Sequence, residues 1–166
     1  MTAIVLMGVA GCGKSTLGVE LARVLGRPLI EGDAFHPAAN VAKMRAGIPL
    51  DDADRYGWLA ALGRELRRHP DGALLACSAL KKIYRDQLRE AAPGLLFVYL
   101  ELSPEDARRR LEIRAEKHFF QANLVTSQFE ALEPPLAEPG VLALDATLPL
   151  AELTQRVREW LNAGAQ

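Results

Sequence analysis

The stretch that decides the fold is residues 8–16, Gly8-Val9-Ala10-Gly11-Cys12-Gly13-Lys14-Ser15-Thr16, which fits the pattern G-x-x-x-x-G-K-[ST]. An apolar run at residues 3–7 precedes it, and residues 17–25 after it carry leucine and valine at helical spacing. These flanks predict a strand, then a glycine-rich loop, then a helix. The backbone N–H groups of such a loop and the positive end of the helix dipole together attract the phosphates of a nucleotide.

Each residue type within this loop has its own part in binding a polyphosphate. The glycines allow successive N–H groups to turn toward one ligand. The Lys14 ammonium can reach the β- and γ-phosphates, and the Ser15 hydroxyl can bind Mg²⁺. The Cys12 side chain is expected to pack away from the phosphates. The predicted nucleotide-binding residues of the loop are Gly8, Gly11, Cys12, Gly13, Lys14, Ser15 and Thr16.

Length and composition indicate one soluble globular domain. The chain has 166 residues, of which 49% are hydrophobic and 25% are charged. Its net charge of −1 gives no broad basic surface, so we expect no nucleic-acid partner. No apolar run approaches the roughly 20 residues that span a bilayer, so we expect no membrane partner.

The N-terminus and the cysteines indicate a cytoplasmic protein. The first residues lack the charged segment of a signal peptide and lead directly into the predicted strand. Cys12 and Cys77 show no metal-ligand spacing. A disulfide between them is conceivable if both lie at strand ends, but a reducing cytoplasm disfavours it.

Strand-like and helix-like segments alternate along the chain. This order predicts an α/β fold in which a five-stranded parallel sheet carries helices on both faces. Right-handed crossovers bring the phosphate-binding loop to the carboxyl edge of that sheet, where the other strands also end. The predicted strands are residues 3–7, 28–31, 73–77, 95–100 and 141–144. The predicted helices are residues 14–26, 38–46, 52–68, 81–91, 104–114, 123–132 and 150–161.

Two carboxylates, Glu31 and Asp33, follow the second predicted strand. Glu31 could serve the metal, and Asp33 could accept the proton of a reacting hydroxyl. Gly32 between them permits close approach of a ligand. The alternative is that Asp33 only caps the following turn. The third predicted strand ends at Cys77 and Ser78, without the aspartate that holds Mg²⁺ in many such proteins.

Residues 33–55 are rich in polar side chains that could hold a small hydroxy acid. His36 precedes Pro37 and is predicted in an extended turn rather than on an apolar helix face. Arg45 and Arg55 are candidates for a substrate carboxylate, because a planar guanidinium binds one through two hydrogen bonds. The alternatives are a structural role for His36 and a solvated helix face for Arg45.

Ser78, Lys81 and Arg85 are spaced i, i+3 and i+7, which predicts one stripe of a helix that begins near Lys81. Cations at a helix N-terminus are unfavourable without an anion. The stripe therefore predicts a bound anionic group, with solvated surface lysines as the alternative.

Arginines recur over residues 106–120, but acidic residues interleave with them and cancel most of the field. Phosphoryl transfer needs cations over the phosphates and the exclusion of water. This segment is therefore better explained as a lid helix that closes over the γ-phosphate than as a nucleic-acid patch.

Three longer stretches of the chain form a more specific set. They are Gly32-Asp33-Ala34-Phe35-His36-Pro37 with Asn40 and residues 43–59, Cys77-Ser78-Ala79-Leu80-Lys81-Lys82 with residues 84–89, and His118-Phe119-Phe120 with residues 124–135. Together with the loop, they resemble the gluconokinase family of small phosphate-loop kinases, relatives of shikimate and adenylate kinases. The resemblance covers almost the whole chain.

The resemblance implies ATP-dependent phosphorylation of D-gluconate to 6-phospho-D-gluconate, with Mg²⁺. It also implies a fold like that of the nucleoside monophosphate kinases, and a homodimer. The implied single kinase domain has three parts. These are a core of residues 1–34, 70–114 and 134–166, a substrate-binding segment of residues 35–69, and a lid of about residues 115–133.

The resemblance also implies roles for single residues. Asp33 would orient the acceptor hydroxyl, Arg110 would lie near the adenine, and Arg114 would close on phosphate. The predicted sites are Asp33, Lys14 and Arg114 for catalysis, Arg110 and Thr147 for the nucleotide beside the loop, Asp33, His36, Arg45, Arg55, Ser78, Lys81 and Arg85 for the substrate, and Ser15 and Glu31 for the metal.

The chain departs from the family pattern at two places. Glu31 stands where the family usually has aspartate, which leaves its contact with the metal open. The lid has one more residue before His118, with Ala115-Glu116-Lys117 in place of a shorter basic turn. This leaves open whether Arg110, Arg114 or Lys117 reaches the γ-phosphate.

Two other functions stay open at this point. One is a kinase for another small hydroxy acid such as shikimate. A shikimate kinase would show a glycine-rich wall after the third strand, where this chain has Ser78-Ala79-Leu80-Lys81. A nucleotide-dependent switch without catalysis would need segments that sense the γ-phosphate and a surface for a partner. The sequence has neither a large basic face nor an extended tail for such a partner.

Overall fold

The computed structural model describes residues 2–115 and 122–165, without the side chains of residues 114, 115, 122 and 123. Its sheet has five parallel strands in the order β2-β3-β1-β4-β5. The strands are β1 (Ile4–Met7), β2 (Leu29–Glu31), β3 (Leu74–Ala76), β4 (Leu96–Glu101) and β5 (Val141–Asp145). The helices are α1 (Lys14–Leu25), the short 3₁₀ helix η1 (Gly32–Phe35), α2 (Ala38–Arg45), α3 (Asp52–Arg67), α4 (Lys82–Ala91), α5 (Pro104–Ala115), α6 (Ala122–Ala131) and α7 (Leu150–Asn162).

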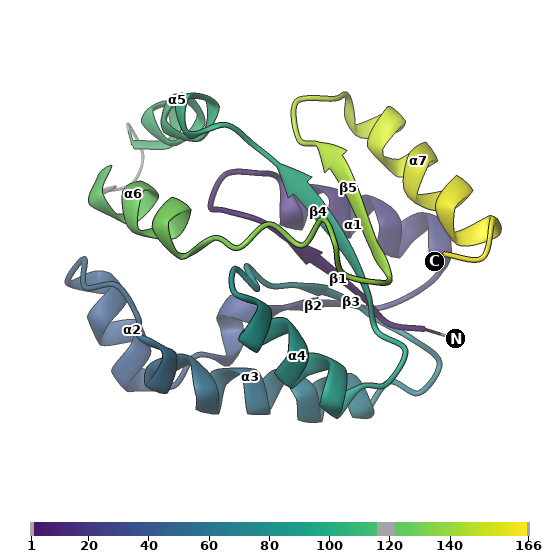
Figure 1. Ribbon diagram of the computed structural model, residues 1–166, viewed down its shortest axis with the longest axis horizontal. Helices are drawn as coiled ribbons and strands as arrows, with labels where there is room; N and C mark the ends of the chain where they lie inside the picture. Colours follow the sequence, from purple (N-terminus) through teal and green to yellow (C-terminus); the bar gives the residue numbers. More distant parts are fainter. Residues whose placement is uncertain (1, 116–121, 166) are drawn as a thin grey trace.

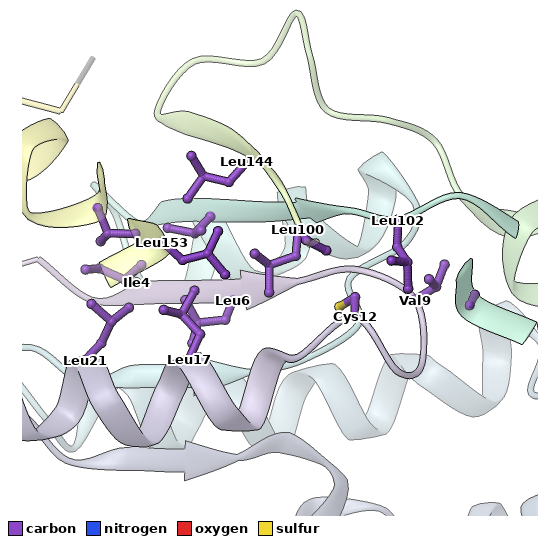
Figure 2. Close-up of a cluster of buried hydrophobic side chains, with 14 of the residues drawn as sticks. Ile4, Leu6, Val9, Cys12, Leu17, Leu21, Leu100, Leu102, Leu144 and Leu153 are labelled. Carbon is purple, nitrogen blue, oxygen red and sulfur yellow. The ribbon is translucent and has the colours of Figure 1, made fainter. Parts of the chain in front are cut away.

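Successive residues of the central strand β1 point to opposite faces of the sheet and enter two separate cores. Ile4 and Leu6 belong to a core that α1 and α7 complete, and Figure 2 shows its leucine-rich centre. Val5 and Met7 belong to a second core that α3 and α4 complete. All four residues are fully buried. The sheet is therefore covered on both faces, as parallel sheets require.

The carboxyl ends of the strands meet at one edge of the sheet (Figure 1, left). The loop after β1 lies at this edge, and α2, α5 and α6 gather around it, while both termini lie at the opposite end. The predicted α/β fold class and parallel sheet are confirmed, and each predicted boundary lies within about one residue of the observed one. Within the described residues, every helix is too short or too polar to cross a membrane.

Local sequence signals explain where helix α3 begins and where helix α1 ends. The Asp51 carboxylate caps α3 by accepting from the Asp54 N–H at 2.7 Å, and the Asp54 carboxylate accepts from the Asp51 N–H at 3.0 Å. This reciprocal capping box satisfies two N–H groups that the helix cannot pair itself. Helix α1 ends at Gly26, whose left-handed backbone (φ 63°) suits glycine.

Substitutions at two glycines of α3 can test how tightly this helix packs against α4. A Cβ at Gly63 would lie 2.6 Å from the Ala91 Cβ, whereas a Cβ at Gly57 would have no neighbour within 4 Å. We expect Gly63→Ala to lower the free energy of unfolding by about 1–3 kcal/mol, because neither methyl group can rotate away. Gly57→Ala, the matched control, should raise it by about 0.5–1 kcal/mol through helix propensity. Urea denaturation measures both, and equal effects at the two positions would contradict this packing.

Candidate active site

The loop between β1 and α1 has the backbone that a phosphate-binding loop requires. Gly8, Gly11 and Gly13 have φ of 145°, 82° and 99°, a region that favours glycine. A Cβ at Gly8 would also lie 2.9 Å from the Leu100 carbonyl oxygen. The Cys12 side chain is buried in the first core, as expected (Figure 2). The loop therefore turns its backbone, not its side chains, outward at the start of α1.

The ammonium group of Lys14 lies over this loop. Its Nζ donates to the carbonyl oxygens of Gly8 at 2.9 Å and Val9 at 3.2 Å. Next to it, the Ser15 hydroxyl donates to the Glu31 carboxylate at 3.0 Å. The positive end of the α1 dipole, an ammonium group and a hydroxyl–carboxylate pair thus stand side by side, which is the chemistry of a polyphosphate with a metal.

One cavity of about 330 Å³ joins this loop to the predicted acceptor residues. Lys14, Ser15, Asp33, His36, Arg55 and Ser78 all line it. Its apolar wall is Met44, Ile48, Pro49 and Leu50, and α6 contributes Leu124, Ser127 and Gln128. With Gly11, Gly13 and Thr16, which also line it, the structure therefore brings nine of the predicted site residues to one space.

Asp33 and His36 form one wall of this cavity. The Asp33 side chain is 96% exposed, and its Oδ1 lies 3.8 Å from the His36 Nε2. The imidazole stacks on the Trp58 indole at 4.1 Å between ring centroids. Burial lowers the pKa of His36, the Asp33 carboxylate opposes this shift, and the Arg55 cation adds to it. His36 is therefore neutral near pH 7 and acts as a hydrogen-bonding group rather than as a cation.

A second cavity of about 200 Å³ shares Arg55, Ser127 and Gln128 with the first and adds Asp52, Lys81 and Tyr84. The Lys81 Nζ donates to Asp52 at 2.9 Å, and the Tyr84 hydroxyl donates to the same oxygen. These two donors lower the pKa of the Asp52 carboxyl. Arg55 and Lys81 both lie over the Tyr84 ring, at 5.4 and 5.8 Å from its centroid. Two cations thus line the second cavity, which suits an acidic group.

The predicted helical stripe of Ser78, Lys81 and Arg85 is wrong. Helix α4 begins only at Lys82, and the preceding loop contains Ala79 with φ 46°. Because that loop changes direction, the three side chains separate: Ser78 lines the first cavity and Lys81 the second. Arg85 reaches neither.

Arg85 lies in the protein interior, with its side chain 0% exposed. Its guanidinium donates to both oxygens of Glu138, to the Ala79 carbonyl at 2.7 Å and to the Glu133 carbonyl at 2.8 Å. Burial alone would raise the pKa of Glu138, but the hydrogen bonds from Arg85 and Arg89 lower it. With all its nitrogen atoms bonded inside the protein, Arg85 is a structural cation in this structure rather than a ligand of the substrate.

Two further predicted residues, Arg45 and Arg110, are not among the described residues that line these two cavities. Arg45 is exposed at the end of α2 and lines neither of them. Arg110 donates to the carbonyl oxygens of Gly11 and Ala146, both at 2.9 Å. The Arg114 side chain lies outside the described residues, as do residues 116–121 with Lys117 and His118.

Arg110 borders a third cavity, of about 340 Å³, on the other side of the phosphate-binding loop. Gly11, Thr16, Ile113, Leu148 and Leu150 are among its other walls. Thr147 faces a different hollow, and its N–H and hydroxyl both donate to the Asp145 carboxylate, at 2.8 and 2.7 Å. The third cavity is largely apolar, which suits a nucleotide base, and Arg110 rather than Thr147 lies on its wall.

Sequence reasoning missed the role of Gln128. Its side-chain oxygen accepts from the Ala10 N–H of the phosphate-binding loop at 2.7 Å, and it lines both cavities. It also missed that Tyr84 forms part of the second cavity. Only the resemblance of residues 124–135 and 84–89 pointed to these segments, because a glutamine or tyrosine on a helix carries no signal of its own.

Comparisons with known proteins agree with this geometry. A family model described as an AAA domain matches residues 4–139. The thermoresistant gluconokinase of Escherichia coli strain K12 is 42% identical over 164 residues, which cover 96% of this chain and 93% of that protein. The gluconokinase of Gluconobacter oxydans strain 621H is 47% identical over 135 residues, which cover 80% of this chain and 75% of that protein.

Solved structures show the same relation. The crystal structure of a gluconokinase from Sinorhizobium meliloti 1021 has a TM-score of 0.91 and 45% identity, covering 99% of this chain and 93% of that chain. A shikimate kinase from Acinetobacter baumannii has a TM-score of 0.62 and 17% identity, covering 99% of this chain and 94% of that chain. The second similarity concerns the fold alone.

Replacing Arg85 separates a structural role from substrate binding. We expect Arg85→Met to lower the free energy of unfolding by about 3 kcal/mol, because Glu138 and two carbonyl oxygens lose a buried partner. Arg156→Met is the matched control, since Arg156 forms an exposed pair with Glu152 that should change stability by less than about 1 kcal/mol. Urea denaturation measures both. Unchanged stability together with a raised KM for the acceptor would indicate that Arg85 binds the substrate.

Proposed function

The chain belongs to the gluconokinase family of phosphate-loop kinases, and on that premise we propose that it transfers the γ-phosphoryl group of ATP to D-gluconate. The product is 6-phospho-D-gluconate. The observation that carries the proposal is the shared cavity, in which Lys14 and Ser15 of the phosphate-binding loop meet Asp33, His36 and Arg55.

ATP occupies the side of the loop that α1, α5 and α7 enclose. The backbone N–H groups of the loop, the α1 dipole and Lys14 hold the β- and γ-phosphates. The base enters the cavity that Arg110 borders. Arg114, at the end of α5, is proposed to close on the transferring phosphoryl group as part of a lid.

Ser15 and Glu31, beside the phosphate-binding loop, form a corner of the site that fits Mg²⁺. We call it the metal corner. Among the described residues no set of three or more His, Cys, Asp or Glu side chains could hold a metal by itself. This agrees with Mg²⁺ chemistry, since the ion keeps several waters and takes most other ligands from phosphates. Ser15 and Glu31 would hold it, directly or through water. When bound, Mg²⁺ neutralises charge on the phosphates.

The Glu31 side chain is one methylene longer than the aspartate usual in the family. Its carboxylate accepts from the Ser15 hydroxyl at 3.0 Å, so the longer side chain ends beside the other proposed metal ligand. The substitution is therefore compatible with the proposed metal role.

Gluconate is an open chain with a carboxylate at one end and the reacting hydroxyl at the other. We place its carboxylate near Arg55 and Lys81 and its terminal hydroxyl near Asp33. The hydroxyl oxygen then forms a bond to the γ-phosphorus as the bond to the β–γ bridging oxygen breaks. Asp33 orients the hydroxyl and takes its proton, and Lys14 stabilises the charge on the phosphates.

We also propose that the protein is a cytoplasmic homodimer with neither nucleic-acid nor membrane partners. The net charge of −1 and the family resemblance support it. Residues 35–69 form the substrate-binding segment and about residues 115–133 form the lid of one kinase domain. A shikimate kinase and a non-catalytic switch are less favoured, because curated relatives at 42% and 40% identity and a solved structure at 45% identity are gluconokinases.

A coupled ADP assay tests the substrate. ATP and Mg²⁺ are supplied with D-gluconate, with its stereoisomers and with shikimate in parallel. We expect turnover with D-gluconate that exceeds turnover with every other acid. Turnover with shikimate alone would replace the substrate, and nucleotide binding without any acceptor would favour a switch.

The proposed base is tested by Asp33→Asn, which keeps size but cannot accept the proton. We expect kcat to fall by about 10²- to 10⁴-fold, while the Kd for ATP stays nearly unchanged because Asp33 lies on the acceptor side. Asp71→Asn, at an exposed turn, is the matched control and should leave both values unchanged. An unaltered kcat for Asp33→Asn removes this residue from the mechanism.

The metal role of Glu31 is tested by Glu31→Gln. We expect the Mg²⁺ concentration for half-maximal activity to rise by about 10-fold, as for other carboxylates that orient metal ligands. Glu20→Gln, on α1 and paired with Arg23, serves as the control. If titration with Mg²⁺ gives the same midpoint for Glu31→Gln and the wild-type chain, Glu31 does not serve the metal.

A further inference from the structure

The two nitrogen atoms of His36 face groups with opposite hydrogen-bonding roles. Its Nδ1 lies 3.3 Å from the Asn40 side-chain nitrogen, which can only donate. Its Nε2 lies 3.8 Å from the Asp33 carboxylate, which can only accept when ionised. Both contacts therefore favour a neutral ring whose single proton is on Nε2.

The orientation of the Asn40 amide is fixed independently of His36. Asn40 is 2% exposed, and its Nδ2 donates to the Asp54 carbonyl oxygen at 2.9 Å. An amide oxygen in that place would face another oxygen without a hydrogen between them. The second N–H of the same amide is therefore directed at His36 Nδ1. A proton on Nδ1 would face this N–H, and the two hydrogen atoms would repel each other.

The surroundings hold this arrangement in place. Asp54 is fixed by the capping box of α3, and its carboxylate also accepts from Lys43 at 2.7 Å. The Trp58 indole stacks on the imidazole and donates to the Gly32 carbonyl at 2.8 Å. Two helices and η1 therefore clamp the ring, whose side chain is 3% exposed.

Asp33 has no such support of its own. Within the described residues its carboxylate makes no hydrogen bond, and the nearest ionisable partner is His36. Because the side chain is almost fully exposed, its rotation about χ1 is free and must be restricted for catalysis. A small rotation would bring Oδ1 within hydrogen-bond distance of Nε2.

We propose that Asn40 is a positioning residue that holds His36 as the Nε2–H tautomer, so that His36 donates to Asp33 and aligns its carboxylate with the acceptor hydroxyl. Asn40 itself touches neither substrate nor the reacting atoms. The alignment of the hydroxyl rests on the proposed kinase function, whereas the tautomer does not.

The charged groups around the ring support a neutral imidazole. Asp33 on η1 raises its pKa, while burial and Arg55 on α3 lower it, and the net shift is downward. Asn40 on α2 and Trp58 on α3 are uncharged. A neutral ring carries one N–H, and Asn40 decides which nitrogen has it.

Nitrogen NMR of the full chain tests the tautomer without any substrate. The chain has three histidines, so ¹⁵N-histidine labelling gives few signals, and His36→Gln assigns the one that disappears. We expect the neutral Nε2–H form of His36 near pH 7. A neutral Nδ1–H form or an imidazolium in the wild-type chain would overturn the proposal.

Asn40→Asp reverses the hydrogen-bonding role of position 40 at constant size. A carboxylate there accepts from Nδ1–H, so we expect the His36 signal to move to the Nδ1–H or imidazolium form. We expect kcat with gluconate to fall by about 10- to 100-fold at high pH, where the neutral Nδ1–H ring has no donor at Nε2. The loss should shrink at low pH, where an imidazolium carries N–H on both nitrogens, and the Kd for ATP should stay unchanged. Asn162→Asp, the same change at an exposed position, should alter neither. An unchanged tautomer in Asn40→Asp refutes the role of Asn40.

A pair of His36 variants tests the role of Nε2 without any change at Asn40. The glutamine amide nitrogen can occupy the place of Nε2, and the asparagine amide nitrogen can occupy that of Nδ1. We expect His36→Gln to keep kcat within about 10-fold of the wild type and His36→Asn to lose about 100-fold. Equal kcat values for the two variants would contradict a donor at Nε2.

The two proposals fail in different ways. If the chain does not phosphorylate gluconate, the wild type shows no turnover while the NMR result stands. If the tautomer is wrong, the NMR result fails while turnover with gluconate remains.

Discussion

The turn at Gly8 is the constraint on which the rest of the site depends. A Cβ there would lie 2.7 Å from the Cys12 sulfur and 2.9 Å from the Leu100 carbonyl oxygen, so the chain can leave β1 in this direction only without a side chain. That departure sends Cys12 into the core and points the first turn of α1 at the cavity. The central position of β1 then places the loop between strand ends that come from both sides of the sheet.

The two halves of the site are built by different physical means. The donor half consists of backbone groups and a helix terminus, which need only the correct φ and ψ angles. The acceptor half consists of side chains on η1, α2 and α3, held by a buried network. Trp58 donates to Gly32, Asn40 donates to Asp54, and the imidazole of His36 lies between them. Because each of these buried polar groups has a partner, the wall can stay rigid while Asp33 projects into the cavity.

Local pattern was sufficient to predict the fold and the glycine-rich turn of the phosphate-binding loop. The glycine-rich loop, the apolar runs and the capping residues act within a few residues of one another, so their outcome follows from the sequence alone. The positions of Glu31, Asp33 and Ser78 at strand ends were predictable for the same reason, since parallel strands end at one edge.

The acceptor half was less predictable, because it depends on contacts between distant segments. The partner of Arg85 is Glu138, 53 residues away, and the partner of Lys81 is Asp52, 29 residues away. Spacing along a presumed helix suggested that both cations face one anion. The left-handed Ala79 lies in the loop before that helix, which begins only at Lys82, and the local sequence does not predict a positive φ at an alanine.

Arg85 still contributes to the site, although it does not face it. Its guanidinium joins the Ala79 carbonyl, next to Ser78, to the Glu133 carbonyl, just after α6. Glu133 in turn donates its N–H to the Leu80 carbonyl and accepts from the Lys82 N–H. An apolar side chain could fill the same volume, and buried ion pairs are often replaceable in stability terms. An apolar side chain could not, however, donate hydrogen bonds to the carbonyl oxygens of Ala79 and Glu133, which lie on two separate segments. The buried cation therefore fixes the loop that carries Ser78 relative to the segment that follows α6, and the position of α6 over the cavity depends on that link.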